Sequence, residues 1–359
     1  MKPLQFDSAL LRQTSRYSQN LTIPDYPRSP DGTLDREETL RVMLWEEYGF
    51  VNDEDLTVTV EVTEVLEKQY AGKCRQTKLK FIFAKDGDCA SFPVNVFVPY
   101  ANPNPEMIVD IDFYQATTSR CLPLEELMDR GVSIAHFCYK DVTSDNGDFA
   151  NGIARLLTDR NDPHAAGKLA LWSYAASQVA TYLLENGYAS EDRLYVAGAS
   201  RLGKTAFLTA ARDERFAGTF VLVSGSCGAA IAREKQGETL EKICRVFPYW
   251  FCTHFHQYVN REAEMPFDQH YLGALVAPRK LCIGTAEKDI WADTDAQYLM
   301  AEATDVIYRE MGLVGLACKG EMLPQGKRTI EGRIGFQKRS GEHAFSRDDW
   351  NFFIDHIRT

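Results

Sequence analysis

The amino-acid sequence predicts an α/β fold in which helices cover both faces of a mostly parallel central sheet. Two patterns carry this prediction. Short, almost entirely apolar runs of strand length recur along the chain, and after residue 150 they alternate with amphipathic helical segments. The composition agrees with a globular protein, since 45% of the 359 residues are hydrophobic and 25% are charged.

The first part of the chain is expected to form an N-terminal arm and a helix that pack on the core. Residues 20–37 are rich in Pro, Gly and Asp, which predicts irregular structure, and a helix follows at about Arg36–Tyr48. Three strand-like runs come next, TVTVEVTEV, KLKFIF and FPVNVFV. We expect one domain overall, with the arm and helix in residues 1–55 and the main body in residues 56–359.

The main body alternates buried strands with helices. The expected strands are IVDIDF (108–113), VSIAHFCY (132–139), RLYVAGA (193–199), TFVLV (219–223) and KLCIGTA (280–286). Apolar residues recur at helical spacing in segments 169–183, 294–311 and 346–357. Thr294 with Gln297 is a candidate capping box for the second helix, and Ser346 is a candidate N-cap for the third. Active sites of such sheets lie at the carboxyl ends of the strands, where chemistry is therefore expected.

Charge and cysteine usage exclude several classes of protein. The net charge is −11 without any basic block, which argues against nucleic acid as a partner. No apolar run approaches the roughly 18 residues of a membrane span, and the opening stretch lacks the apolar centre of a secretory signal. Nine cysteines without a CxxC pair indicate neither a zinc knuckle nor a disulfide framework. A cytoplasmic protein with reduced thiols is expected.

A candidate nucleophile follows the strand that ends at residue 199. The turn reads Gly198-Ala199-Ser200-Arg201-Leu202-Gly203-Lys204 and opens a helix. A nucleophile elbow needs small neighbours for its tight turn and lifts the serine hydroxyl above the sheet. The common elbow reads GxSxG, whereas here the second glycine comes one place later. The motif alone therefore leaves an ordinary strand–helix turn as an alternative.

Acidic residues and a histidine follow later in the chain. The strand KLCIGTA is succeeded by Glu287, Asp289 and Asp293, and His343 precedes the last helix. The order Ser, acid, His is that of the α/β-hydrolases. In this interpretation His343 takes the proton of Ser200, and a carboxylate holds its imidazole in the required tautomer.

These motifs resemble the glucuronoyl esterases, carbohydrate esterase family 15, over roughly residues 35–359. The resemblance rests on Gly-x-Ser-Arg-x-Gly-Lys at 198–204, Gly-Glu-Thr at 237–239, Phe-Pro-Tyr-Trp-Phe at 247–251, Asp-Gln-His at 268–270, Ala-Pro-Arg at 277–279, Lys-Asp-x-Trp-x-Asp at 288–293 and Gly-Glu-His at 341–343. It implies a three-layer α/β-hydrolase and a serine esterase that cleaves the ester between glucuronic acid on xylan and lignin alcohols.

The resemblance also implies roles for individual residues. Ser200 matches the nucleophile, His343 matches the base, and Arg201 matches an arginine that helps to stabilise the oxyanion. Lys204, Glu238 and Trp291 match residues that bind the hydroxyls and the face of the glucuronate ring. No cofactor and no metal are expected.

Three departures from the family pattern shape the expectation. Many members carry a catalytic Glu where this chain has Val223, so we assign Asp289 as the acid, with Glu287 and Asp293 in reserve. A frequent disulfide pair is replaced by Ala199 and Ala344, which fits a reducing compartment. The missing export signal favours a small uronate ester or an imported oligosaccharide over polymeric lignin–xylan.

Other interpretations stay open at this point. A simple or acetyl carboxylesterase shares the triad, and a catalytically degenerate carbohydrate-binding protein would explain Val223. Gly198 to Thr205 also matches the Walker A spacing, but its loop carries a bulky Arg-Leu pair. His254 and His256 form an HxH in a segment expected to be helical, where alternate residues diverge, so a metal site is disfavoured.

Overall fold

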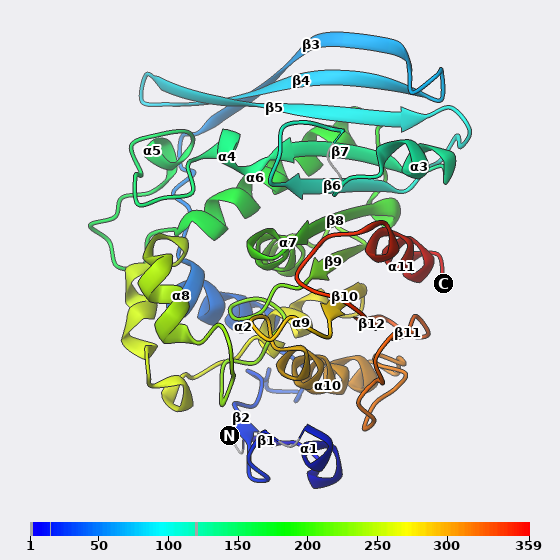
Figure 1. The fold of residues 1–359 in the computed structure, drawn as a ribbon. Coiled ribbons are helices and arrows are strands. Elements are labelled where there is room, and N and C mark those ends of the chain that lie inside the picture. The colour runs from blue at the N-terminus through cyan, green and yellow to red at the C-terminus, as the bar shows by residue number, and fades with distance from the viewer. Residues whose placement is uncertain (1–2, 15, 119–120) are drawn as a thin grey trace.

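A ten-stranded sheet forms the centre of the protein (Figure 1); the computed structural model describes residues 3–14, 16–118 and 121–359. The strand order is β11-β12-β10-β9-β8-β6-β7-β5-β4-β3. Neighbours from β7 to β12 run parallel, while β5, β4, β3 and β11 are antiparallel to their partners. The strands are β3 (Thr57–Gln69), β4 (Cys74–Lys85), β5 (Asp88–Pro99), β6 (Met107–Asp112), β7 (Ser133–Cys138), β8 (Leu194–Ala199), β9 (Gly218–Leu222), β10 (Lys280–Ala286), β11 (Lys327–Thr329) and β12 (Ile334–Arg339). A separate two-stranded pair joins β1 (Leu4–Gln5) to β2 (Thr22–Ile23).

Helices cover both faces of the sheet, as the apolar strands require. The helices are α1 (Ser8–Thr14), α2 (Arg36–Met43), α3 (Leu124–Asp129), α4 (Tyr139–Val142), α5 (Ala154–Leu157), α6 (Lys168–Glu185), α7 (Arg201–Arg212), α8 (Leu240–Val246), α9 (His270–Val276), α10 (Thr294–Glu310) and α11 (Arg347–Ile357). Strand β8 shows the division: Leu194 and Val196 pack with α6 and α7, whereas Tyr195 and Ala197 pack with α3 and α11. This is the three-layer arrangement of the α/β-hydrolases. Within the described residues, no helix has the combination of length and apolar character that crossing a membrane demands.

The N-terminal arm shares the core of the main body. Leu10, Leu11 and Tyr17 are buried in the same apolar cluster as the helices on one face of the sheet. The Tyr26 hydroxyl donates to the Ala303 carbonyl of α10 over 2.9 Å. The helix predicted at Arg36–Tyr48 forms as α2, followed by a π-helical turn from Leu44 to Tyr48.

One of the two predicted helix caps is confirmed, and the other was wrong. Ser346 is the N-cap of α11 and forms a capping box with Asp349. The capping box expected at Thr294 and Gln297 was wrong. Asp293 caps α10 instead, accepting from the Ala296 N–H while its own backbone is left-handed, with φ 58°. The predicted strands before residue 100 were too short, because hairpin pairing extends β3, β4 and β5 beyond their apolar centres.

Candidate active site

The turn between β8 and α7 holds Ser200 in a strained backbone conformation. Its φ is 58° and its ψ is −125°, a combination that costs energy for a residue with a side chain. The turn depends on its glycines. A Cβ added to Gly198 would lie 2.2 Å from the Leu202 carbonyl oxygen, and one on Gly203 would lie 2.9 Å from that of Leu222. The sequence thus forms a nucleophile elbow, although the second glycine is displaced by one residue.

His343 and Asp289 meet at the same edge of the sheet, after β12 and β10. The Nδ1 atom of His343 lies 2.6 Å from Oδ2 of Asp289, and the other oxygen of Asp289 accepts the Ala292 N–H over 3.0 Å. Asp289 is buried, whereas the imidazole is 42% exposed. Among the hydrogen bonds of the described residues there is none between Ser200 and His343.

The two reserve acids lie elsewhere. Asp293 is buried beneath the N-terminal arm, where its carboxylate accepts from the Tyr17 hydroxyl over 2.9 Å and pairs with Arg16 over 3.0 Å. Within the described part of the chain, neither Asp293 nor Glu287 bonds to His343. Asp289 is therefore the member of the predicted set that geometry places beside the imidazole.

Ser200 and His343 line the same cavity, which has a volume of about 640 Å³. It is lined by Phe113, Tyr114, Cys121, Ala199, Ser200, Arg201, Val223, His343, Ala344, Phe345, Ser346 and Arg347. Val223 thus stands inside the site and offers only an apolar wall. Ala199 and Ala344 line this cavity too, so the two alanines that replace a frequent disulfide pair face a common space.

Arg201 is fixed by a set of contacts that the sequence did not reveal. Its guanidinium pairs with Asp145 and lies 4.9 Å and 4.8 Å from the ring centres of Phe247 and Trp250. Trp250 donates from Nε1 to the same carboxylate over 2.8 Å. The Nε of Arg201 is buried without a hydrogen-bond partner among the described residues. A cationic donor thus stands directly beside Ser200.

Lys204 and Glu238 are brought together, but away from the cavity over Ser200. The Lys204 ammonium donates to Glu238 over 2.8 Å and to the carbonyls of Ser224 and Ser226 over 2.5 and 2.6 Å, so its three protons are all engaged. Both side chains are buried. The third residue of the set, Trp291, is 46% exposed, and its carbonyl accepts the Glu238 N–H over 2.9 Å.

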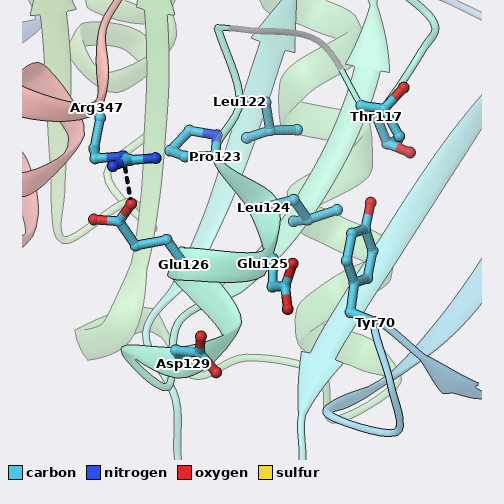
Figure 2. Close-up of a pocket in the computed structure, with 10 residues that line it drawn as sticks. Tyr70, Thr117, Leu122, Pro123, Leu124, Glu125, Glu126, Asp129 and Arg347 are labelled. Carbon is cyan, nitrogen blue, oxygen red and sulfur yellow. Dashed lines mark ion pairs between the residues drawn. The ribbon is translucent and has the colours of Figure 1, made fainter.

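A second cavity, of about 500 Å³, adjoins the first (Figure 2). Arg347 lines both cavities and forms an ion pair with Glu126 over 2.6 Å, drawn as the dashed line in Figure 2. Glu125 and Asp129 add further negative charge to the lining. These carboxylates are ion-paired, Glu126 with Arg347, and Glu125 and Asp129 with Lys73.

One cluster in the described residues has the composition of a metal site. Ligand atoms of Asp110, Asp112 and His136 all lie within 4.8 Å of one another, and the three side chains are buried. Both ring nitrogens of His136, however, face acceptors of this chain, the Asp110 carboxylate at 2.9 Å and the Tyr114 carbonyl at 3.0 Å. In this arrangement His136 offers no lone pair to a metal ion, and the three side chains form a hydrogen-bond network. Its sequence signal was visible as charged residues inside apolar strands.

The two histidines of the HxH motif, His254 and His256, also contact acceptors of this chain. His254 Nε2 lies 3.0 Å from a Glu46 carboxylate oxygen, and His256 Nε2 lies 3.1 Å from the Pro248 carbonyl. The two imidazoles lie on a 3₁₀ helix, Thr253–Tyr258, and face different segments.

Comparison with known proteins decides the family. The model of the fungal glucuronyl esterase family matches residues 82–312, which is well over half of the chain. The chain belongs to the glucuronyl esterase family. Its members are serine esterases, and the elbow, the imidazole–carboxylate pair and the arginine described above lie on that family's α/β-hydrolase fold.

Individual members of the glucuronyl esterase family are moderately similar in sequence to this chain. A carbohydrate esterase from an unknown prokaryotic organism is 35% identical over 236 residues, covering 65% of this chain and 54% of that protein. A 4-O-methyl-glucuronoyl methylesterase of Podospora anserina is 30% identical over 163 residues, 43% of this chain and 34% of that one. The chain thus spans about half or less of the length of these relatives.

Solved structures match over nearly the whole chain. A promiscuous esterase of carbohydrate esterase family 15 from a marine bacterial metagenome is 26% identical, with a TM-score of 0.81 over 94% of this chain and 97% of that one. A glucuronoyl esterase from Solibacter usitatus is 25% identical, with a TM-score of 0.84 over 94% and 98%. The α/β-hydrolase fold expected from the sequence is confirmed.

Proposed function

We propose that the protein is a serine carboxylesterase that hydrolyses an ester of a hexuronic acid. One observation carries the proposal: an elbow serine with strained backbone, an arginine and an imidazole paired with a buried carboxylate surround one cavity. The related methylesterase of Podospora anserina, named for 4-O-methyl-glucuronoyl esters, supports the choice of acyl group.

The reaction would follow from the geometry in two steps. The Ser200 oxygen attacks the ester carbonyl while its proton passes to Nε2 of His343, and the proton then goes to the departing alcohol. Water next attacks the acyl-enzyme by the same route and releases the uronic acid and Ser200. Asp289 holds Nδ1–H and stabilises the imidazolium, and Arg201 meets the charge that develops on the carbonyl oxygen.

Selection of the uronate is assigned to Lys204, Glu238 and Trp291. The exposed Trp291 offers an apolar ring face to a sugar, as carbohydrate sites commonly do. Lys204 and Glu238 are engaged with each other, so sugar hydroxyls would have to share or displace that ion pair. We propose a small uronate ester or an oligosaccharide bearing one as the substrate.

The test compares hydrolysis of methyl or benzyl glucuronate with that of p-nitrophenyl acetate, for the wild type and Ser200→Ala. We expect a preference for glucuronate that the substitution abolishes. Activity on acetate alone would retain the serine mechanism and refute the uronate assignment. A wild type that hydrolyses neither ester, and whose Ser200 is not labelled by a fluorophosphonate, would refute the enzyme and favour a carbohydrate-binding protein.

A simple carboxylesterase is the second candidate. Its support is the structural similarity to an esterase described as promiscuous. The same comparison of esters separates the two candidates.

We also propose that the protein works in a reducing compartment such as the cytoplasm. The support is that Ala199 and Ala344 stand where relatives often carry a disulfide, and that Cys138, Cys244 and Cys282 are buried thiols. Fractionation of the producing cell tests this proposal, and recovery outside the cytoplasm would refute it.

A further inference from the structure

Three ionisable side chains are buried at the carboxyl ends of β6 and β7. Asp110 and Asp112 lie two residues apart on β6, so they point to the same face of the sheet, and Asp110 is paired in register with His136 of β7. Their exposures are 1%, 5% and 0%. Apolar residues would fill this part of a core at lower cost, because buried charges must be paired to be tolerated. The cluster therefore calls for a role beyond packing.

The hydrogen bonds define the protonation of His136. Its Nδ1 lies 2.9 Å from the Asp110 carboxylate, and its Nε2 lies 3.0 Å from the Tyr114 carbonyl. Since a carboxylate and a carbonyl both accept, this arrangement favours a ring that donates from both nitrogens, an imidazolium. Burial acts to lower the pKa of His136, but the hydrogen bond and charge of Asp110, with the charge of Asp112, outweigh it and leave that pKa raised.

Asp112 binds the backbone N–H groups of the two residues that follow it, Phe113 and Tyr114. Its Oδ1 accepts the N–H of Phe113 over 2.5 Å and that of Tyr114 over 3.4 Å. The Cys138 thiol donates to the Phe113 carbonyl over 3.4 Å. Together with the bond from His136, every backbone N–H and C=O of Phe113 and Tyr114 is thus bonded to a side chain from the end of β6 or β7.

This segment occupies a place that matters for catalysis. In α/β-hydrolases the loop after this strand commonly supplies a backbone N–H to the oxyanion. Here both N–H groups are engaged by Asp112, so stabilisation of the oxyanion falls to Arg201 and the amides at the start of α7. The Phe113 ring lies 5.9 Å from the Arg201 guanidinium, and Phe113 and Tyr114 both line the cavity over Ser200.

We propose that Asp110, Asp112 and His136 are positioning residues for the esterase, which hold Phe113 against Arg201 and Tyr114 in the cavity wall, so that the guanidinium stands where the oxyanion forms. The proposal rests on the proposed function, because it assigns these residues to the serine mechanism. None of the three needs to touch substrate. Their effect on the reaction passes through the wall of the cavity.

Two substitutions of one residue test the proposal. His136→Gln can place an amide N–H where Nε2 stands and so retain the bond to Tyr114. His136→Asn can place one where Nδ1 stands, which retains the bond to Asp110 and loses that to Tyr114. Both remove the same buried ring, so each controls for the stability cost of the other.

We expect kcat of His136→Asn to fall by about 30- to 100-fold with KM little changed, because a misplacement of about 1 Å near the chemistry costs up to about 100-fold. We expect kcat of His136→Gln to stay within about fivefold of the wild type. Equal kcat values in the two variants at matched folded fraction, measured by circular dichroism, would overturn the proposal. A lower Tm of His136→Asn without a lower kcat would also overturn the proposal.

A second pair covers the case in which both His136 variants fail to fold. Asp112→Asn retains the Oδ1 acceptor for Phe113 and Tyr114, whereas Asp112→Ala removes it, and only the alanine variant is expected to lose kcat. The rate of Ser200 labelling by a fluorophosphonate is measured in parallel, since it needs no particular ester. If the wild type ignores uronates but its labelling rate follows the same order among the variants, the uronate assignment fails and the positioning role stands. Equal labelling rates in the wild type and in all the variants would refute the positioning role itself.

Discussion

Replacing Asp289 with asparagine should reduce kcat by about three orders of magnitude while leaving the fold intact. The carboxylate accepts only two hydrogen bonds in the described residues, from His343 at 2.6 Å and from the Ala292 N–H at 3.0 Å. An asparagine can keep the bond to Ala292, but its amide nitrogen would face Nδ1. The imidazole would then adopt the wrong tautomer and could not accept the Ser200 proton.

The size of the effect follows from the charge that His343 acquires. Two unit charges about 4 Å apart interact by about 4 kcal/mol at an effective dielectric constant near 20. At about 1.4 kcal/mol per decade of rate, the lost carboxylate charge reduces kcat by about a thousandfold. The wrong tautomer can extend the loss to about ten-thousandfold.

The assay is steady-state hydrolysis of the best ester, with the fluorophosphonate labelling rate of Ser200 as a second measurement. Glu287→Gln is the matched control, because it removes a neighbouring carboxylate that does not bond to His343. We expect the control to retain wild-type kcat. The reasoning is refuted if Asp289→Asn keeps more than about a tenth of wild-type kcat, or if Glu287→Gln loses as much.

Three further predictions concern stability. Asp293→Ala should lower the free energy of unfolding by about 2–4 kcal/mol, because it removes the N-cap of α10 and the acceptor of the buried Tyr17 hydroxyl, and urea unfolding measures it. Lys204→Met should cost a similar amount by leaving Glu238 buried and unpaired, and the double variant Lys204→Met/Glu238→Leu should recover much of the loss. Burial raises the pKa of Glu47 to about 7, so the folded state keeps a proton that the unfolded chain loses above about pH 4.5. Stability from this group therefore falls as the pH rises from 4.5 to 7, by about 3 kcal/mol in total, and Glu47→Gln should remove that slope in urea unfolding at several pH values.

Each of these predictions has an outcome that contradicts it. Asp293→Ala should leave the labelling rate of folded Ser200 unchanged, and a large fall would assign Asp293 to the triad. A raised KM for glucuronate in Lys204→Met without loss of stability would show that the lysine acts on substrate alone. Parallel stability curves for Glu47→Gln and the wild type would show that Glu47 titrates normally in the fold.

The sequence predicted the layers of the fold and the placement of the three triad candidates because both depend on local patterns. Ser200, Asp289 and His343 each follow an apolar run, and the carboxyl ends of parallel strands meet at one edge. Their catalytic roles stay predictions. The cap of α10 was missed because Asp293 acts from a left-handed backbone, which residue types do not reveal.

The contacts around Arg201 and His136 could not be predicted for a different reason. Asp145 reaches Arg201 from 56 positions earlier in the chain, and no spacing rule connects two such loops. Asp110 and His136 were readable as charges inside apolar strands, but their partners depend on strand order. Neighbouring strands in the sheet, β6 and β7, determine that these two side chains meet.

The short loop from Asp289 to Asp293 binds three distant parts of the molecule at once. It offers Asp289 to His343 and the Trp291 carbonyl to Glu238, and it ties Asp293 to Tyr17, 276 positions away in the sequence. Residues 16 and 17 are therefore bonded to the loop that carries Asp289, although they lie outside the sheet. Evolution should accept substitutions in the arm and in this loop in pairs, and a chimera that exchanges the arm of one relative for that of another would have to exchange the loop with it.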